Sequence, residues 1–265
     1  MDRMRKNRPL IEFKDITVIK GDKAILNGIT VSVLEGEHAA ILGPNGSGKS
    51  SFIKTITREF YPIERDGRIF RIFGEDNWDV FTLRKSLGIV SNELQSSFSR
   101  TITGMEVVLS GFFSSIGVYR QPIRRKMRNK AESIIDFLEV GHLKGRNMNE
   151  MSSGEARRFL IGRALVHDPK ALILDEPANS LDISATHKFR QIIRKISRSG
   201  IGIIVVTHNF ADVIPEISRV ILMKDGSFYK DGRKDSIITS LNMTELFSVP
   251  VMIRREKGYY YAIAE

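Results

Sequence analysis

The chain has 265 residues, of which 42% are hydrophobic and none is cysteine, and its formal net charge is +10. This length suits a core domain with an inserted or appended subdomain, and the lack of cysteine excludes disulfide bonds and thiolate metal sites. The longest apolar run, residues 201–206, is far shorter than the roughly 18–20 residues that span a bilayer. Residues 1–10 are basic but lack the apolar segment of a secretory signal, so we expect a protein that is soluble or reaches a membrane only through partners.

Basic side chains cluster at residues 3–8, 120–130 and 254–257. Such clusters suit nucleic acid, anionic lipid or nucleotide phosphates, but solvated helix faces also carry them without any partner. Charge alone therefore leaves the partner open.

The first elements in chain order are strands. Residues 11–19 and 25–33 alternate apolar and polar side chains, which predicts a half-exposed antiparallel pair. An apolar strand at 37–42 leads into a glycine-rich turn and a helix start. Further on, residues 170–177 and 202–209 are apolar runs that end in polar residues, as strands buried on both faces of a parallel sheet do.

Helical patterns fill the rest of the core. No β-rich run interrupts residues 94–150 after the apolar run at 87–91, so we predict an inserted helical subdomain there. Within it, a helix is expected to end at Gly141, and a second helix, between the two apolar runs, is expected to stop at Gly200. Their apolar stripes consist of Met127, Ala131, Ile134, Ile135 and Leu138 in the first and Ala185, Phe189, Ile192, Ile193 and Ile196 in the second.

Two hairpins complete the chain. Residues 219–232 contain an Asp-Gly turn between apolar runs, and residues 251–265 read as strands around the turn at 256–258.

The sequence GPNGSGKS at 43–50 matches a phosphate-binding loop (P-loop) between a strand and a helix. Its glycines let backbone N–H groups turn toward phosphate oxygens, and the following helix presents its positive end to them. We expect Lys49 to reach the β- and γ-phosphates and Ser50 to ligate Mg²⁺. The predicted ATP-binding residues are Gly43, Pro44, Asn45, Gly46, Ser47, Gly48, Lys49, Ser50 and Ser51.

Three polar residues end the buried strands downstream of this loop. Asp175 closes one strand, where a carboxylate can hold Mg²⁺, and Glu176 follows it as a candidate general base for water. His208 ends the next strand, at the edge of a parallel sheet where α/β ligand sites gather, and is a candidate γ-phosphate contact. A solvated acidic turn and a structural histidine are the alternatives.

Residues 151–155, MSSGE, form a second small-residue turn. Ser152 and Glu155 satisfy the S-x-x-E pattern of a capping box, and a capped helix start also attracts anions. Two such helix starts with only one P-loop are explained most simply if the second serves a nucleotide bound by another copy.

These motifs resemble those of ATP-binding cassette (ABC) ATPases, the nucleotide-binding subunits of ABC transporters. GPNGSGKS resembles their Walker A motif, MSSGE the signature, ALILDE at 171–176 the Walker B motif, NSLD at 179–182 the D-loop, and His208 the switch histidine. The resemblance implies ATP hydrolysis with Mg²⁺, held by Ser50 and Asp175, in an ATP-dependent head-to-tail homodimer that drives a transmembrane permease. Such a subunit would lie at the cytoplasmic face of the cell membrane. The residues implied to bind ATP in trans are Ser152, Ser153, Gly154 and Glu155, with Ser180, Leu181 and Asp182 forming the D-loop.

The resemblance predicts an α/β fold. It comprises a P-loop NTPase core with a mostly parallel sheet, an N-terminal antiparallel β subdomain and an inserted α-helical subdomain. The predicted parts are a basic tail at 1–9, the core at 10–93 and 159–232, the helical signature subdomain at 94–158 and a C-terminal extension with a hairpin at 233–265.

Two positions depart from the family pattern. The Q-loop glutamine aligns with Asn92, which is one methylene shorter, and Gln95 is the alternative if the loop shifts. The adenine-stacking aromatic aligns near Lys20, and no aromatic lies between Phe13 and Phe52.

Residues 110–120 resemble a subgroup of stand-alone ABC ATPases similar to molybdate-transport ATPases, which also lack the usual Q-loop glutamine. In the family a groove beside the Q-loop receives a helix of the permease. Its candidates are Phe112, Phe113, Ile116 and Tyr119, which otherwise would be core residues.

Two other functions compete. A soluble ABC ATPase acting on nucleic acid or ribosomes fits the positive charge, but the chain has a single cassette and no coiled-coil insertion before the signature. A P-loop small-molecule kinase would leave residues 151–155 and Glu176 unexplained.

Overall fold

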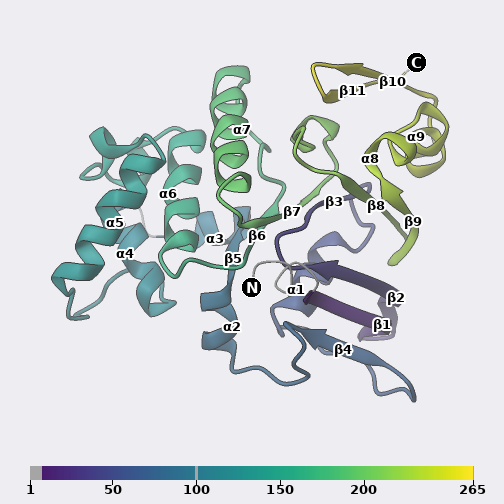
Figure 1. Cartoon of the computed structure of the whole chain (residues 1–265), viewed down its shortest axis with the longest axis horizontal. Helices are drawn as coiled ribbons and strands as arrows, with labels where there is room; N and C mark the ends of the chain where they lie inside the picture. The colour runs from purple at the N-terminus through teal and green to yellow at the C-terminus, as the bar shows by residue number, and fades with distance from the viewer. Residues whose placement is uncertain (1–7, 99–100, 265) are drawn as a thin grey trace. The chain divides into compact units, whose positions relative to one another are not determined.

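The computed structural model describes residues 8–98 and 101–264 (Figure 1). It forms two compact units, Met1–Val80 with Gly202–Glu265 and Phe81–Ile201. Most of the predicted basic tail, residues 1–7, lies outside the described residues.

An antiparallel sheet opens the first unit. Strands β1 (Pro9–Lys20) and β2 (Lys23–Leu34) pair as predicted, and β4 (Ile69–Ile72) joins the other side of β1. The ring of Phe13 on β1 lies 5.9 Å from that of Phe52 on helix α1 (Lys49–Ile56), so aromatic packing fixes this helix on the sheet.

Parallel strands form the second layer of this unit. Strand β3 (His38–Leu42) lies between β7 (Gly202–Thr207) and β8 (Arg219–Lys224), parallel to both. All of β7 is buried, as expected for a strand covered on both faces. Strand β9 (Ser227–Arg233) returns antiparallel to β8 through Asp225 and Gly226, both with positive φ, which confirms the first predicted hairpin.

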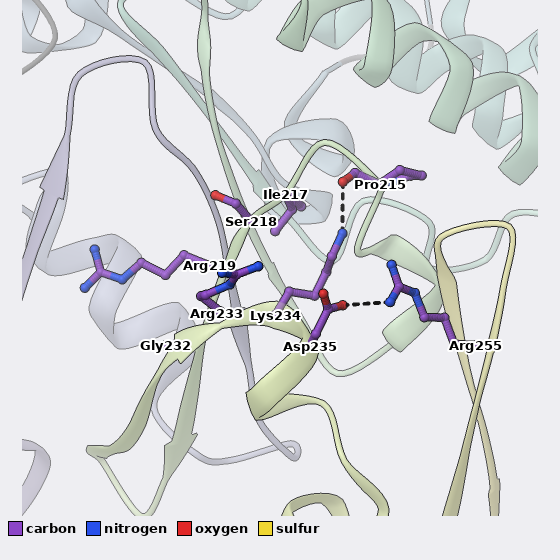
Figure 2. A pocket seen from close by; sticks show the side chains of 9 residues that line it. All are labelled: Pro215, Ile217, Ser218, Arg219, Gly232, Arg233, Lys234, Asp235 and Arg255. Carbon is purple, nitrogen blue, oxygen red and sulfur yellow. Dashed lines mark hydrogen bonds and ion pairs between the residues drawn. The ribbon is translucent and has the colours of Figure 1, made fainter.

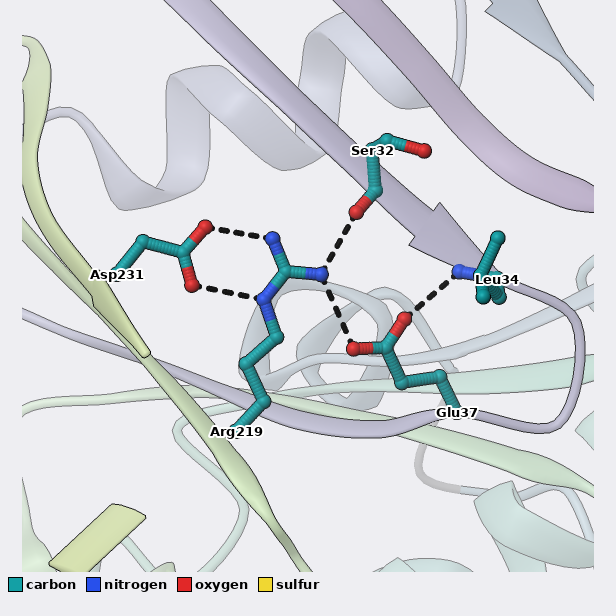
Figure 3. A network of polar contacts seen from close by, with 5 residues as sticks. All are labelled: Ser32, Leu34, Glu37, Arg219 and Asp231. Atoms are coloured by element: carbon teal, nitrogen blue, oxygen red, sulfur yellow. Dashed lines mark hydrogen bonds and ion pairs between the residues drawn. The ribbon is translucent and has the colours of Figure 1, made fainter. Parts of the chain in front are cut away.

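Arg219 ties three segments of the first unit together (Figure 3). Its guanidinium forms two bonds with Asp231 on β9, at 2.7 and 2.5 Å. It also donates to the carbonyl oxygen of Ser32 on β2 at 2.7 Å and to Glu37 at 3.0 Å. The hydrogen bonds that Arg219 donates to Asp231 and then to Glu37 raise the pKa of Arg219 despite its partial burial, so the cation stays charged beside these carboxylates.

A 3₁₀ turn, η5 (Phe210–Asp212), follows β7, and the C-terminal extension carries helices α8 (Lys234–Ile237) and α9 (Ser240–Phe247) and the hairpin β10 (Val251–Glu256) with β11 (Tyr259–Ala264). The second predicted hairpin is thereby confirmed. Tyr260 donates its hydroxyl to Asp235 of α8, and burial together with this bond raises the pKa of Tyr260 to about 12. This contact anchors the hairpin to α8.

The second unit is mainly helical, with β5 (Leu87–Val90) and β6 (Ala171–Asp175) pairing in parallel. Its other elements are α2 (Val80–Ser86), α3 (Asn92–Ser97), α4 (Gly104–Ser110), η2 (Gly111–Phe113), α5 (Arg125–Phe137), η3 (Gly141–Leu143), η4 (Met148–Glu150), α6 (Ser153–Leu165) and α7 (Ile183–Ser197).

Glycines let α6 pack closely inside this unit. A Cβ at Gly162 would lie 3.0 Å from Val108 of α4, and one at Gly104 would lie 2.5 Å from the ring of Phe159 on α6. The predicted end of α5 at Gly141 is wrong, because the helix stops at Phe137 and Glu139 turns the chain with φ 60°. A glycine in the left-handed conformation commonly marks the end of a helix, but here the residue in that conformation is a glutamate, so the sequence does not mark this helix end.

The apolar stripe of α7 is buried at Phe189, Ile192, Ile193 and Ile196, whereas Ala185 is half-buried. No helix in the described part of the chain is long and apolar enough to cross a membrane.

Candidate nucleotide-binding and hydrolysis site

The P-loop lies in the first unit, between the end of β3 and the start of α1. Gly48 caps α1 with φ 104°, and a Cβ there would lie 3.1 Å from the carbonyl oxygen of Ile25 and 2.8 Å from Met223 Cε. The amide of Gly43 donates to the carbonyl oxygen of Thr207 at 3.3 Å, so the loop begins beside the end of β7. Only a residue without a side chain fits this cradle at Gly48.

Lys49 crosses the loop that carries it. Its Nζ donates to the carbonyl oxygens of Gly43 at 2.8 Å and Pro44 at 3.0 Å, and the residue is 6% exposed. The hydroxyl of Ser47 is buried and has no hydrogen-bond partner among the described residues. A bound phosphate would balance the charge of Lys49 and would accept a hydrogen bond from the buried Ser47 hydroxyl. These residues therefore fit a nucleotide.

The turn after β7 holds His208 in the same unit. Thr207 donates its hydroxyl to the buried carboxylate of Asp212 at 2.7 Å and accepts from the amide of Asn209 at 3.0 Å. Asn209 in turn accepts from the amide of Ala211 at 3.0 Å. These bonds fix the backbone on both sides of His208, which is half-buried.

The second unit places Asp175 as the last residue of β6 and Glu176 directly after it. Glu176 has φ 47°, in the left-handed region that non-glycine residues rarely adopt, and its carbonyl oxygen accepts from the amide of Asn179 at 3.2 Å. Such a conformation costs on the order of 1 kcal/mol or more and persists only where surrounding contacts fix it. The turn therefore breaks the alternation of a strand, and both carboxylates are half-buried.

The predicted capping box at 151–155 is present. The Ser152 hydroxyl accepts from the amide of Glu155 at 3.3 Å, and the Glu155 carboxylate accepts from the amide of Ser152 at 2.8 Å. The backbone bond from Ser152 holds the pKa of Glu155 below its usual value. Ser152 and Ser153 are exposed, whereas Gly154 is buried, with a Cβ there 2.9 Å from Ala185 of α7.

The D-loop residues lead directly into α7. Ser180 is exposed with φ 65°, Leu181 donates its amide to the carbonyl oxygen of Ala178 at 3.2 Å, and Asp182 caps α7 by accepting from the amide of Ala185 at 2.7 Å. The same helix start thus contacts the buried glycine of the signature turn.

Both Q-loop candidates lie on α3 and contact one residue that the sequence interpretation did not single out, Arg157 of α6. Its guanidinium donates to the side-chain oxygen of Asn92 and, at 3.3 Å, to that of Gln95. It also donates to the carbonyl oxygens of Glu176 at 3.0 Å and Pro177 at 2.9 Å. The available signal was its helical spacing, three and four residues before the buried Leu160 and Ile161.

A pocket of about 540 Å³ opens elsewhere in the first unit (Figure 2). Two of its cations have protein partners, because Lys234 donates to the carbonyl oxygen of Pro215 at 2.9 Å and Arg255 pairs with Asp235 at 3.2 Å. None of the P-loop residues lines it; the lining residues are Pro215, Ile217, Ser218, Arg219, Gly232, Arg233, Lys234, Asp235 and Arg255.

Comparison with known proteins identifies the family. The family model described as "ABC transporter" matches residues 26–179. The chain belongs to the ABC transporter family. It is an ABC ATPase, the ATP-binding cassette that energises a transporter. The uncharacterized ABC transporter ATP-binding protein YlmA of Bacillus subtilis (strain 168) is 29% identical to it over 92% of this chain and 93% of that protein.

Solved structures of cassettes confirm the predicted α/β fold. An ABC transporter cassette, MJ1267, in its ADP conformation matches with a TM-score of 0.77 and 25% identity, covering 91% of this chain and 97% of that one. The dimeric structure of the bacterial cassette MJ0796 matches with a TM-score of 0.69 and 26% identity, covering 84% and 98%. ABC cassettes thus form dimers, and cbiO1 of Clostridium perfringens, a cassette of similar fold, is part of an ABC transporter complex.

Proposed function

We propose that this ABC ATPase acts as a homodimer in which two copies face head to tail around two Mg-ATP and drive a transmembrane permease at the cytoplasmic face of the membrane. The observation that carries the proposal is the pair of helix starts suited to phosphate. One follows the P-loop, whereas the other presents exposed Ser152 and Ser153 at the capped start of α6 without a P-loop of its own. The dimeric form of a related cassette supports this arrangement.

Each motif residue then has a chemical role. Lys49 would bind the β- and γ-phosphates, His208 would contact the γ-phosphate, and Glu176 would polarise the attacking water. The Ser50 hydroxyl and the Asp175 carboxylate are oxygen donors of the kind that Mg²⁺ prefers. When bound, Mg²⁺ neutralises charge that develops on the phosphates during transfer. Ser152, Ser153, Gly154 and Glu155 would bind the facing copy's ATP, beside the D-loop residues Ser180, Leu181 and Asp182.

We place the chain with the stand-alone, molybdate-transport-like ATP-binding proteins that have an altered Q-loop. Asn92 and Gln95 lie one helical turn apart on α3, and a single guanidinium contacts both. This shared contact supports an altered Q-loop in which the two amides act together.

Complementation between two damaged variants tests the head-to-tail dimer. Lys49→Ala removes the P-loop charge, and Ser153→Asp places a negative charge at the exposed helix start facing the partner's phosphate. Each variant alone should be nearly inactive, because every site in its homodimer is damaged. A mixed dimer combines both lesions in one site and leaves the other intact, so mixing should restore phosphate release.

Ser153→Asn is the matched control, since it has the same shape as Ser153→Asp without the charge. An acidic residue in the first turn does not destabilise a helix, so both variants should fold alike. Because coupled sites can prevent turnover in a mixed dimer, ATP-dependent dimerisation is measured alongside. If no mixture regains either activity or dimerisation, the turn at 151–155 serves as a helix cap only.

A further inference from the structure

Arg157 is a buried charge in the second unit. It lies on α6, two residues after Glu155 of the capping box, and is 2% exposed. A buried guanidinium is costly unless its N–H groups are hydrogen-bonded, so the oxygens around it are a structural requirement.

The bonds from Arg157 run to two separate segments. One guanidinium nitrogen donates to the carbonyl oxygens of Glu176 and Pro177, at 3.0 and 2.9 Å, in the turn after β6. The other two nitrogens donate to the side-chain oxygens of Asn92 and Gln95 on α3. A planar fork of five donors can serve both segments at fixed angles, which an ammonium group cannot do.

These bonds bear on the carboxylate proposed to polarise water. Glu176 holds a left-handed backbone conformation, and its carbonyl oxygen is bound by Arg157 on one side and by the amide of Asn179 on the other. Removing the guanidinium would release one restraint on a conformation that the chain does not favour. The backbone from which the Glu176 side chain extends would then no longer be held in one position.

We propose that Arg157 is a positioning residue for ATP hydrolysis, which sets the backbone of Glu176 and joins that turn to the Q-loop residues and to the helix of the signature turn. The proposal rests on the role proposed above for Glu176. It also accounts for Asn92, because the guanidinium reaches this shorter amide directly.

Arg157→Lys tests whether the planar guanidinium is needed at this position, and Arg158→Lys is the matched control. Arg158 is the next residue on α6, but it donates to the carbonyl oxygens of Leu138 and Glu139 and to neither segment above. Arg157→Lys should lower kcat at saturating ATP by about tenfold or more while the Kd for ATP changes by less than about threefold. Arg158→Lys should keep kcat within about twofold. Wild-type kcat in Arg157→Lys would overturn the proposal.

A double-variant cycle separates positioning from a general loss of stability. In a Glu176→Gln background, measured by single-turnover hydrolysis, Arg157→Lys should add little further loss, because the residue acts through Glu176. An equal fold-loss in both backgrounds would overturn the proposal. Wild-type turnover in Glu176→Gln alone would contradict the role of Glu176 and this proposal together, whereas slow Glu176→Gln with unaffected Arg157→Lys would contradict this proposal alone.

Should Arg157→Lys not fold, the exposed Asn92 offers a second probe with an isosteric pair. Asn92→Leu removes the acceptor and should lower kcat by about fivefold, while Asn92→Asp keeps an acceptor and should lower kcat less than Asn92→Leu does. The concentration of Mg²⁺ for half-maximal activity should not change, since the lost contact is with Arg157. Full activity in Asn92→Leu, or a raised Mg²⁺ requirement with kcat restored at high Mg²⁺, would overturn the proposal.

Discussion

At the scale of single residues, Glu176 should separate ATP binding from ATP hydrolysis. Glu176→Gln keeps the size and the backbone of this residue but removes the base, so the P-loop should bind ATP as before. General-base catalysis contributes about 10²–10⁴-fold, and we expect a loss of phosphate release in that range. Equilibrium binding of a fluorescent ATP analogue and a phosphate-release assay measure the two properties. Undiminished turnover would remove Glu176 from the mechanism.

The site residues that could be predicted from the sequence all belong to short, local motifs. The positions of the P-loop, of Asp175 and of the Ser152–Glu155 capping box follow from patterns a few residues long, and the structure places each at the expected strand end or helix start. Arg157 escaped prediction because its partners Asn92 and Glu176 are 65 and 19 residues away. Only the tertiary fold brings such distant acceptors to one side chain.

At the scale of elements, periodicity predicted the strands and the long helices well, because burial dictates which faces are apolar. The ends of helices were less predictable. Helix α5 ends at Phe137 through Glu139, whose left-handed conformation is stabilised by its surroundings and not by its residue type.

The core interpretation of residues 112–119 is wrong for Ile116 and Tyr119, which are 44% and 77% exposed, whereas Phe112 packs its ring against His167. Apolar side chains alone do not tell a surface from a core.

The capping box of α6 gives a prediction for the stability of this element. Ser152→Ala leaves an amide of the first turn without its side-chain acceptor and should lower the free energy of unfolding by about 1 kcal/mol. Urea denaturation of this variant measures the loss, and Ser153→Ala, which removes an exposed hydroxyl next to the cap, is the control. Equal stability of Ser152→Ala and the wild type would show that the cap contributes nothing.

The charge of Glu155 makes part of this stability depend on pH. Because the backbone bond from Ser152 lowers the pKa of Glu155 in the folded state, ionisation stabilises the fold above the ordinary pKa of a glutamate. That contribution is lost as the pH falls through the lowered pKa. Glu155→Gln keeps a hydrogen-bond acceptor but not the charge, so it should be less stable than the wild type at pH 7 and equally stable in strong acid. A difference that persists in strong acid would assign the effect to shape.

At the scale of the whole molecule, the cassette explains most of the chemistry but not the net charge of +10. Many of the cations within the described residues are bound to other parts of the chain, among them Arg219 to Asp231 and Lys130 to Asp168. Family membership favours a transporter subunit over the nucleic-acid alternative. The positive charge is therefore compatible with a partner membrane and requires no nucleic acid.

The exposed aromatic and aliphatic side chains of residues 112–119 give the last prediction. A cassette that drives a permease must contact it, and Ile116 and Tyr119 expose apolar surface that an isolated subunit gains nothing by exposing. Tyr119→Asp should therefore keep the ATPase activity of the purified chain but lose an integral membrane protein that copurifies with the tagged wild type from detergent-solubilised membranes. Tyr61→Asp, at a position 65% exposed in the other unit, is the control and should retain that protein. Recovery of RNA-bound material that high salt dissociates, with no membrane protein in either preparation, would instead support the nucleic-acid function, because phosphate contacts weaken steeply with salt.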